Sequence, residues 1–379
     1  MNGRLPRVEV DDVWPPAAMV SLPAAVRDRF GVDVRCVRHV PCDDEIVVEV
    51  EAAGDPPATW AACDEPAFAS WSASRWADDR APWERSGWFL GAAATFVDAL
   101  ADLGISVVEG PACIKGCWPC SAVLSAGTDR GRFFWKAFSP KPPREPATLR
   151  ALHALGIKGI PTLVSCGPDD DWMITADFGT DTVTDHEGAL RRFAELQLVV
   201  GDSLAAQLPD FTPAVLATRF STYPRVVDAC SELAASPIGA GLVHQDFRAG
   251  NVAAPCTFFD WSDVVRSHPF FSGIRYLDLF SQAEPEHRWN ELHDLTASPP
   301  RFVELRDAYL APFADAFGRG RALRDFDVAW SLQGAFMSVR WDWEQSHLEH
   351  GAPWSSWLRR FATNEIAMRL ETRLGHAHA

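Results

Sequence analysis

The segment Gly241-Leu-Val-His-Gln-Asp-Phe-Arg-Ala-Gly-Asn251 tells more about the fold of this 379-residue chain than any other stretch. It places His244, Asp246 and Asn251 in the order H-x-D-x-x-x-x-N. Nine residues after the asparagine, a second acid, Asp260, ends a short apolar run. The H-x-D-x-x-x-x-N segment and Asp260 each follow an apolar stretch. These two stretches predict short strands that lead into polar loops.

These polar side chains suit phosphoryl transfer from a nucleotide. The reaction needs a carboxylate that orients and deprotonates an acceptor hydroxyl, and oxygen ligands that hold Mg²⁺ against the phosphates. Asp246 can fill the first role, and Asn251 with Asp260 the second. Because Mg²⁺ keeps several waters, one amide and one carboxylate are enough protein ligands. The alternative is a turn-rich loop whose acids only cap and solvate, and the match in order and spacing argues against it.

This segment resembles the catalytic segment of the aminoglycoside phosphotransferase and choline kinase-like families, which typically read H-G-D-x-x-x-x-N followed by I-D-W. Gln245 replaces the usual glycine, and Asp260-Trp261 differs from the D-F-G of protein kinases. The resemblance covers roughly residues 114–343 and is dense only at this segment. It implies a bilobal, protein-kinase-like α+β fold, with a small antiparallel-sheet lobe and a mostly helical lobe. It also implies Mg²⁺ as cofactor, ATP or GTP as phosphoryl donor, and a small hydroxylated molecule as acceptor.

The resemblance assigns further residues to nucleotide binding. Lys136, on a predicted strand, would grip the phosphates, and Glu145, at the start of the next helix, would pair with this lysine. Ser121 is a candidate donor to phosphate, and Ala176 lies at the strand end that would offer backbone groups to a purine. The alternatives are a solvated strand lysine and an exposed glutamate that stabilises the helix dipole.

Other site residues keep two interpretations each. His244 is expected to fix the loop rather than to perform acid–base chemistry. Arg248 could contact the γ-phosphate or form a surface salt bridge. Asp263, Trp341 and Glu344 are candidate acceptor contacts, because acids suit cationic groups and an aromatic ring suits a flat molecule. Trp341 and Glu344 are three residues apart and share a helix face, but a core tryptophan beside a surface acid explains them equally.

Composition limits the possible partners. The chain has 47% hydrophobic and 23% charged residues, which is ordinary for a soluble protein. Its formal net charge of −16 disfavours nucleic acid and anionic membranes as partners. Residues 1–11 lack the pattern of a leader, and no apolar run approaches the ~20 residues that span a bilayer. The expected location is the cytoplasm.

The chain is expected to have three parts. Residues 1–82 form an accessory α+β domain, 83–176 a kinase-like N-lobe, and 177–379 a helical C-lobe with the catalytic loop. Hydrophobic periodicity predicts helices at 83–103, 146–155, 190–204, 220–235, 274–282, 301–317, 325–344 and 354–374, and strands at 32–40, 46–51, 112–115, 122–126, 132–138, 161–166 and 172–176.

Three cysteines suggest a competing chemistry. Cys113, Cys117 and Cys120 have the C-x-x-x-C-x-x-C spacing that radical S-adenosylmethionine enzymes use to hold an iron–sulfur cluster. Pro119 occupies the position where that family usually has an aromatic residue. With nine cysteines in all, an odd number, reduced thiols are the expected state.

The acceptor remains open at this stage. The resemblance most often implies phosphorylation of an antibiotic, of aminoglycoside or nucleoside type, for resistance or self-protection. Relatives also phosphorylate amino alcohols, sugars and homoserine-like metabolites. A kinase-like regulator that binds nucleotide without turnover is the third alternative. The presence of Lys136, Asp246, Asn251 and Asp260 argues against it, because such regulators usually lack one of these groups.

Overall fold

The computed structural model describes residues 22, 25–31, 34–42, 45–52, 82–84, 87–115, 121–138, 145–179, 181–283 and 298–347. The described chain divides into two compact units. The first contains the described residues up to Phe138 together with Val164–Asp177, and the second contains the described residues of Pro143–Leu163 and Phe178–Ser346. The division of the chain into three domains stays a prediction.

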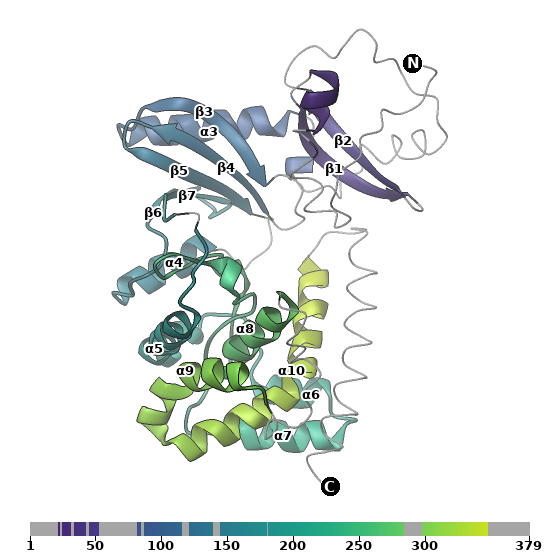
Figure 1. Ribbon diagram of the computed structural model, residues 1–379, viewed down its shortest axis with the longest axis vertical. Helices are drawn as coiled ribbons and strands as arrows, with labels where there is room; N and C mark the ends of the chain where they lie inside the picture. Colours follow the sequence, from purple (N-terminus) through teal and green to yellow (C-terminus); the bar gives the residue numbers. More distant parts are fainter. Residues whose placement is uncertain are drawn as a thin grey trace. The chain divides into compact units, whose positions relative to one another are not determined.

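The first unit is built on a five-stranded sheet with the order β3-β4-β5-β7-β6 (Figure 1). Its strands are β3 (Val107–Lys115), β4 (Ser121–Thr128), β5 (Gly131–Phe138), β6 (Leu163–Cys166) and β7 (Trp172–Ala176). The pairs β3–β4, β4–β5 and β5–β7 are antiparallel. A separate antiparallel hairpin joins β1 (Val34–Cys42) to β2 (Glu45–Ala52), where strands were predicted.

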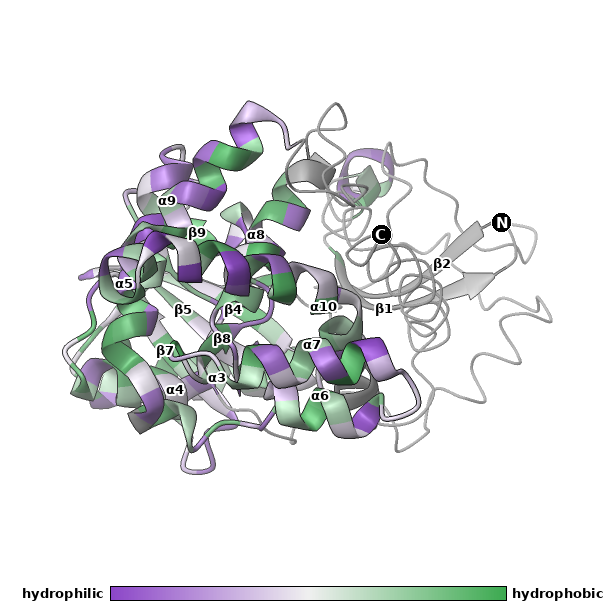
Figure 2. Ribbon diagram, turned by 90° about the horizontal axis from the view of Figure 1, so that it is seen from below, coloured by the Kyte–Doolittle hydropathy of each residue, from purple (hydrophilic) through white to green (hydrophobic). Residues whose placement is uncertain are grey.

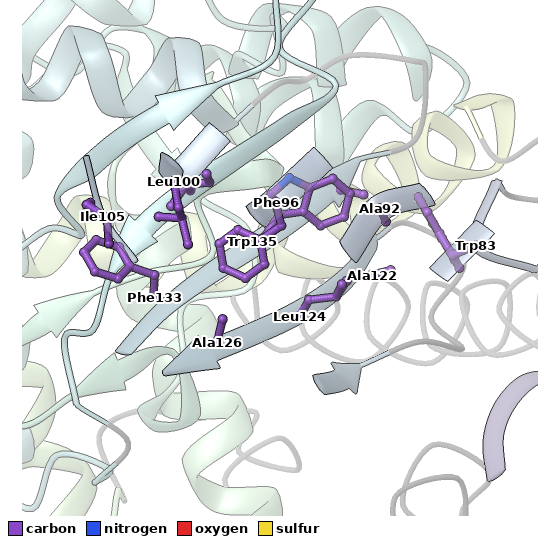
Figure 3. Close-up of a cluster of buried hydrophobic side chains, with 12 residues drawn as sticks. Trp83, Ala92, Phe96, Leu100, Ile105, Ala122, Leu124, Ala126, Phe133 and Trp135 are labelled. Carbon is purple, nitrogen blue, oxygen red and sulfur yellow. The ribbon is translucent and has the colours of Figure 1, made fainter. Parts of the chain in front are cut away.

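Helix α3 (Trp88–Asp102) covers one face of this sheet (Figure 1). Its buried residues Ala92, Phe96 and Leu100 are four apart and therefore share one face. They pack with sheet residues such as Leu124 and Trp135 in one hydrophobic core (Figure 3). The apolar residues that alternate along the strands thus pack against the apolar residues that repeat along one face of α3.

The prediction placed the start of this helix too early. Trp83 lies in the 3-10 turn η1 (Pro82–Glu84), and α3 begins only at Trp88. Gly87 separates them with a left-handed φ of 78°, a conformation that interrupts a right-handed helix. Trp83 is nevertheless fully buried and packs against Trp88, at 6.1 Å between ring centroids.

The second unit is mostly helical. It contains α4 (Glu145–Ala154), α5 (His186–Ala205), α6 (Pro213–Arg219), α7 (Pro224–Ala234), α8 (Phe270–Ala283), α9 (Pro300–Phe317) and α10 (Arg319–His347). The amphipathic pattern is clear on α7, which alternates between hydrophilic and hydrophobic residues (Figure 2) and buries Val226, Cys230 and Leu233. The predicted α+β fold, with an antiparallel sheet in one unit and helices in the other, is confirmed.

Other predicted helices also differ from the structure in their bounds. Those predicted at 190–204 and 274–282 begin earlier, at His186 and Phe270. The helix predicted at 220–235 begins only at Pro224, as α7, because Pro224 fixes its own φ and keeps the preceding Tyr223 extended. The short helix α6, which ends at Arg219, was not predicted. The helix predicted at 325–344 begins earlier, at Arg319. The helix predicted at 354–374 lies outside the described residues. Within the described ranges, no helix combines the length and apolar character needed to cross a membrane.

Short strands frame the predicted catalytic loop in the second unit. β8 (Gly241–His244) pairs antiparallel with β11 (Val264–Ser267), and β9 (Val252–Ala253) pairs with β10 (Thr257–Phe258). The apolar runs before the loop and before Asp260 were predicted to be strands, whereas β11 was not. Its four residues are too few to show a strand period, and its pairing with β8 identifies it.

Gly273 on α8 tests the packing of this unit. A Cβ at this position would overlap the ring of Tyr309, which is fully buried on α9. We expect Gly273→Ala to lower the free energy of unfolding by about 1–3 kcal/mol, since the neighbouring ring is confined. In Gly320→Ala, the new Cβ meets only Arg324 Nη1 at 3.7 Å, so this helix substitution should stabilise by up to about 1 kcal/mol. Denaturant unfolding measures both, and equal effects would contradict the packing.

Candidate active site

The predicted catalytic loop is anchored by the aromatic residue that follows Asp246. Phe247 is fully buried and stacks on Phe193 of α5, with ring centroids 3.9 Å apart and planes at 21°. Tyr276 of α8 packs against Phe247 at 4.9 Å. With Phe247 fixed in the core, its chain neighbours Asp246 and Arg248 remain partly exposed. The loop therefore presents its charged groups from a rigid support.

The carboxylate of Asp246 is held by hydrogen bonds to one of its two oxygens. Its Oδ2 accepts hydrogen bonds from Asn251 Nδ2 at 3.0 Å and from Arg248 Nε at 3.2 Å. Its Oδ1 lies 4.0 Å from Arg275 Nη2, which is longer than a hydrogen bond. The side chain keeps 21% of its surface exposed. In this arrangement Oδ1 is the oxygen better placed to receive the proton of an acceptor hydroxyl.

Asn251 combines two functions in one amide. Its Nδ2 donates to the backbone carbonyl of Asp246 at 2.8 Å as well as to the carboxylate. Both contacts use the nitrogen end of the amide, so Oδ1 is the end that remains for a cation. The residue is buried, at 3% exposure, and closes the short 3-10 turn η2 (Ala249–Asn251).

Asp260 has a strained backbone next to Asn251. Its φ of 65° and ψ of 54° lie in the left-handed region, which is uncommon for residues other than glycine. Neighbouring bonds hold it there: Phe259 N donates to Asn251 O at 3.1 Å, and Ser262 Oγ donates to Asp260 Oδ1 at 3.1 Å. Such outliers concentrate at functional sites. The bond between Phe259 and Asn251 brings the two predicted metal ligands into neighbouring positions.

The contacts of His244 fit the loop-fixing role. Its Nε2 is 3.1 Å from the carbonyl oxygen of Phe259, so the neutral ring carries its proton on Nε2. The ring is fully buried, and burial lowers the pKa of His244, although Asp246 and Asp260 act in the opposite direction. A neutral imidazole that already uses its proton for a backbone oxygen is poorly suited to act as a general acid.

A buried network that was not predicted supports the same strand. The backbone N–H of His244 donates to Ser272 Oγ at 3.0 Å, and Gln197 Nε2 donates to that same oxygen at 3.2 Å. Gln197 also donates to Leu242 O at 2.7 Å and accepts from Tyr309 OH at 2.6 Å. Gln197, Ser272 and Tyr309 come from three helices and share no motif. No signal in a single sequence would have indicated them.

Glu145 lies at the first position of α4, and the exposed alternative for it is wrong. The residue is 1% exposed, and its Oε1 accepts a hydrogen bond from Trp261 N at 2.9 Å. It thereby ties the start of α4 to the residue after Asp260. Its pairing with Lys136 stays a prediction.

The predicted nucleotide-binding residues of the first unit lie on its sheet. Lys136 is partly buried on β5, and its Nζ lies 5.3 Å from the centre of the Phe138 ring. Trp135 and Ala137 are buried on the opposite face, as the alternation predicted. Ser121 begins β4 and Ala176 ends β7.

Of the residues predicted to contact the acceptor, the structure describes the side chain of Asp263 but not those of the other two. Asp263 Oδ2 pairs with Arg340 Nη2 at 3.2 Å, and Arg340 Nη1 donates to the carbonyl of Gln245 at 2.7 Å. Arg340 was not predicted to have any role. Trp341 and Glu344 lie on α10, but their side chains fall outside the described residues.

The donor set of this loop suits Mg²⁺ better than a soft metal. Among the residues that the structure describes, no group of three His, Cys, Asp or Glu side chains is placed to hold a metal ion. Asn251 and Asp260 offer one amide oxygen and one carboxylate, the hard donors that Mg²⁺ takes together with waters and phosphates. Of the closely spaced cysteines, Cys113 is half-buried on β3, and Cys117 and Cys120 lie outside the described residues.

No family model and no curated protein matches the chain. Solved structures do match it. A choline/ethanolamine kinase family protein from Mesorhizobium loti is 14% identical, with a TM-score of 0.49 over 76% of this chain and 98% of its own. An ethanolamine kinase from Plasmodium vivax is 10% identical, with a TM-score of 0.47 over 68% and 81%. A spectinomycin phosphotransferase, in complex with ADP and spectinomycin, is 13% identical, with a TM-score of 0.42 over 74% and 98%.

Substitutions of Glu145 separate its acceptor oxygen from its charge. Glu145→Ala leaves the buried Trp261 N–H without its partner, so we expect a loss of about 1–3 kcal/mol in the free energy of unfolding. Glu145→Gln keeps an oxygen for this bond and should lose clearly less. Denaturant unfolding of both variants tests the contact. If Gln destabilised as much as Ala, the hydrogen bond to Trp261 would not be the source of the effect.

Proposed function

We propose that this chain is a Mg²⁺- and nucleotide-dependent O-phosphotransferase that acts on a hydroxyl of a small molecule. The observation that carries the proposal is the geometry around Asp246. Its carboxylate is oriented by Asn251, and Asn251 is bonded through its backbone to the residue before Asp260. Hydrogen bonds therefore link the proposed base to Asn251, and link Asn251 to the segment that carries Asp260, on a loop anchored in the core.

The residues of the site divide the roles in this mechanism among them. Asp246 accepts a hydrogen bond from the acceptor hydroxyl through its carboxylate, aligns the oxygen with the phosphoryl group, and takes the proton as the new bond forms. Asn251 Oδ1 and the Asp260 carboxylate would hold Mg²⁺, which neutralises charge on the phosphates when it is bound. Lys136 would grip the phosphates, with ATP or GTP as donor. Because positioning and charge neutralisation dominate such reactions, the basicity of Asp246 need not be unusual.

The acceptor in this proposal is an antibiotic of aminoglycoside or nucleoside type, phosphorylated for resistance or self-protection. The alternative is a metabolite such as an amino alcohol, a sugar or a homoserine-like compound. The resemblance of the catalytic segment supports both classes. Incubating the protein with Mg²⁺, γ-labelled ATP or GTP and a panel of hydroxylated antibiotics and metabolites, followed by mass analysis of the products, distinguishes them. A product 80 Da heavier than its parent identifies the acceptor; with nucleotide bound and no such product, the non-catalytic regulator would be favoured.

Removal of the base is the first kinetic test. We expect Asp246→Asn to lower kcat by about 10²–10⁴-fold, the usual contribution of a general base, while nucleotide affinity stays within a few-fold. We expect kcat to fall without a loss of nucleotide affinity because the base acts on the acceptor and not on the donor. Asp228→Asn, at an exposed position on α7, serves as the control and should leave the rate unchanged. An Asp246→Asn enzyme with more than about a tenth of the native rate would remove Asp246 from this role.

Substitution of the two proposed metal ligands is expected to change how the rate depends on Mg²⁺. Asp260→Ala should abolish activity, because the carboxylate supplies most of the protein's charge toward Mg²⁺. Asn251→Ala should raise the Mg²⁺ concentration needed for half-maximal rate and also lower the rate at saturating metal, since Asn251 Nδ2 orients Asp246 as well. Activity titrated against Mg²⁺, together with calorimetry of Mg–nucleotide binding, measures both effects. Normal metal dependence in both variants would refute the assignment.

A further inference from the structure

We infer that Arg340 of α10 is a positioning residue for the proposed reaction. It fixes Asp246 by joining the chain segment that carries this base to the segment that carries Asp260. The inference rests on the proposed function, because it takes Asp246 as the base. In this role Arg340 touches neither substrate nor metal. It acts through the backbone carbonyl of Gln245 and the carboxylate of Asp263.

The base and the proposed metal ligand lie on segments that meet at one end of a two-stranded sheet. His244 and Val264 are the last paired residues of β8 and β11 at this end. Asp246 lies two residues after the first of them, and Asp263 directly precedes the second. The next backbone bond, from Gln245 N to Asp263 O, measures 3.4 Å, beyond the ~2.7–3.2 Å that N–H···O bonds prefer. Sheet pairing therefore weakens where the two segments separate.

One guanidinium spans the two segments at this point. Arg340 Nη1 donates to the carbonyl oxygen of Gln245 at 2.7 Å, and its Nη2 pairs with Asp263 Oδ2 at 3.2 Å. Arg340 is 5% exposed, and hydrogen bonds from a charged donor are stronger than neutral ones. Because the guanidinium is planar and rigid, its two nitrogens hold both acceptors at a fixed separation. The residue before the base is thereby tied to α10 and to the neighbouring segment.

This contact completes the support of the base. The ring of Phe247, stacked on Phe193, fixes the backbone that follows Asp246, and Arg340 fixes the carbonyl of the residue that precedes it. A displacement of about 1 Å at a reacting group can lower a rate about 10²-fold, even when its cause is remote from the chemistry. Loss of Arg340 is therefore expected to slow the reaction without removing any group that takes part in it.

Asp260 has supports of its own. Trp261 N donates to Glu145 Oε1 at 2.9 Å, and Phe259 N donates to Asn251 O at 3.1 Å. Neither bond involves the guanidinium. Loss of the guanidinium should therefore displace the base more than the metal ligand, and should act on kcat rather than on the affinity for Mg–nucleotide.

The kinetics of Arg340 variants provide the first test. Arg340→Met removes the donors but keeps a long side chain. With Mg²⁺, ATP or GTP and the acceptor that the panel identifies, we expect kcat to fall about 10²-fold, while the KM for nucleotide and the Mg²⁺ concentration for half-maximal rate stay within about twofold. Arg340→Lys should lose only about tenfold, since an ammonium group can bond to one of the two acceptors, and it serves if Arg340→Met does not fold. An unchanged kcat, or a loss that added Mg²⁺ restores, would overturn the inference.

Arg321→Met is the matched control for a loss of stability. Arg321 lies on the same helix and pairs at 2.9 Å with Asp325, which is 1% exposed. The other described partner of Asp325 is Ser236, so this pair holds no part of the loop. The variant should lower the free energy of unfolding and leave kcat unchanged. Equal losses of kcat in Arg321→Met and Arg340→Met would assign the effect to a loosened fold and overturn the inference.

Asp263→Asn distinguishes positioning from direct contact with the acceptor. The positioning role predicts a loss of about threefold in kcat, with the KM for the acceptor within about twofold. This loss is smaller than in Arg340→Met because the bond from Nη1 to Gln245 remains. A higher KM for the acceptor with an unchanged kcat would instead make Asp263 an acceptor contact and overturn the inference.

A double-mutant cycle tests whether Arg340 acts through the base. In the Asp246→Asn background, Arg340→Met should lower kcat by less than about threefold, because no base remains to be displaced. If the full loss of about 10²-fold appeared in this background as well, the two residues would act independently and the inference would fail.

Hydrogen exchange keeps the inference separate from the proposed function, because it needs no acceptor. In the protein without ligands, the backbone amides of residues 245–251 should exchange faster in Arg340→Met than in the native protein, and at the native rate in Arg321→Met. If this pattern appears and no acceptor of the panel is phosphorylated, the link between Arg340 and the base segment stands and the proposed activity fails. If exchange in this segment is unchanged in Arg340→Met, the inference fails whatever the activity.

Discussion

The stacking of Phe247 on Phe193 is the contact on which the arrangement of this site depends. A polar loop cannot by itself hold a carboxylate in one orientation, because its side chains gain nothing from leaving water. One aromatic residue between two charged ones solves this: it buries a large apolar surface and adds about 0.5–1.5 kcal/mol from the ring contact. Asp246 and Arg248 then stay at the surface on a backbone that the core immobilises.

Backbone groups, more than side-chain pairs, join the catalytic loop to the segment around Asp260. His244 reaches the carbonyl of Phe259, the N–H of Phe259 reaches Asn251, and the N–H of Trp261 reaches Glu145. These bonds surround the left-handed residue and offset the unfavourable energy of its conformation. The position of Asp260 is therefore set by residues on both sides of it, and by a helix that is more than a hundred residues away in sequence.

Charge is the property of this site that the structure describes most distinctively. The whole chain has a formal net charge of −16, yet two arginines lie beside Asp246. Asp263 is paired with Arg340, and Asp278 is paired with Arg275. The net charge of the molecule thus does not describe the charges at this site, where acids and arginines are paired. Local pairing at short distance outweighs the average, because interactions beyond a Debye length of about 10 Å are screened.

The sequence alone determined the spacing of Asp246 and Asn251, from which the chemistry of the loop is predicted, and most of the elements: the strand alternation around Lys136 and the helices with a clear 3.6-residue period. Such features are local, since they depend on neighbouring residues and backbone geometry. Tertiary structure alone decided the burial of Glu145, the pairing of β11, and the placement of Arg275 beside the base. Those features depend on which distant segments meet when apolar surface is buried, and the residues involved share no spacing in the chain that a sequence pattern could reveal.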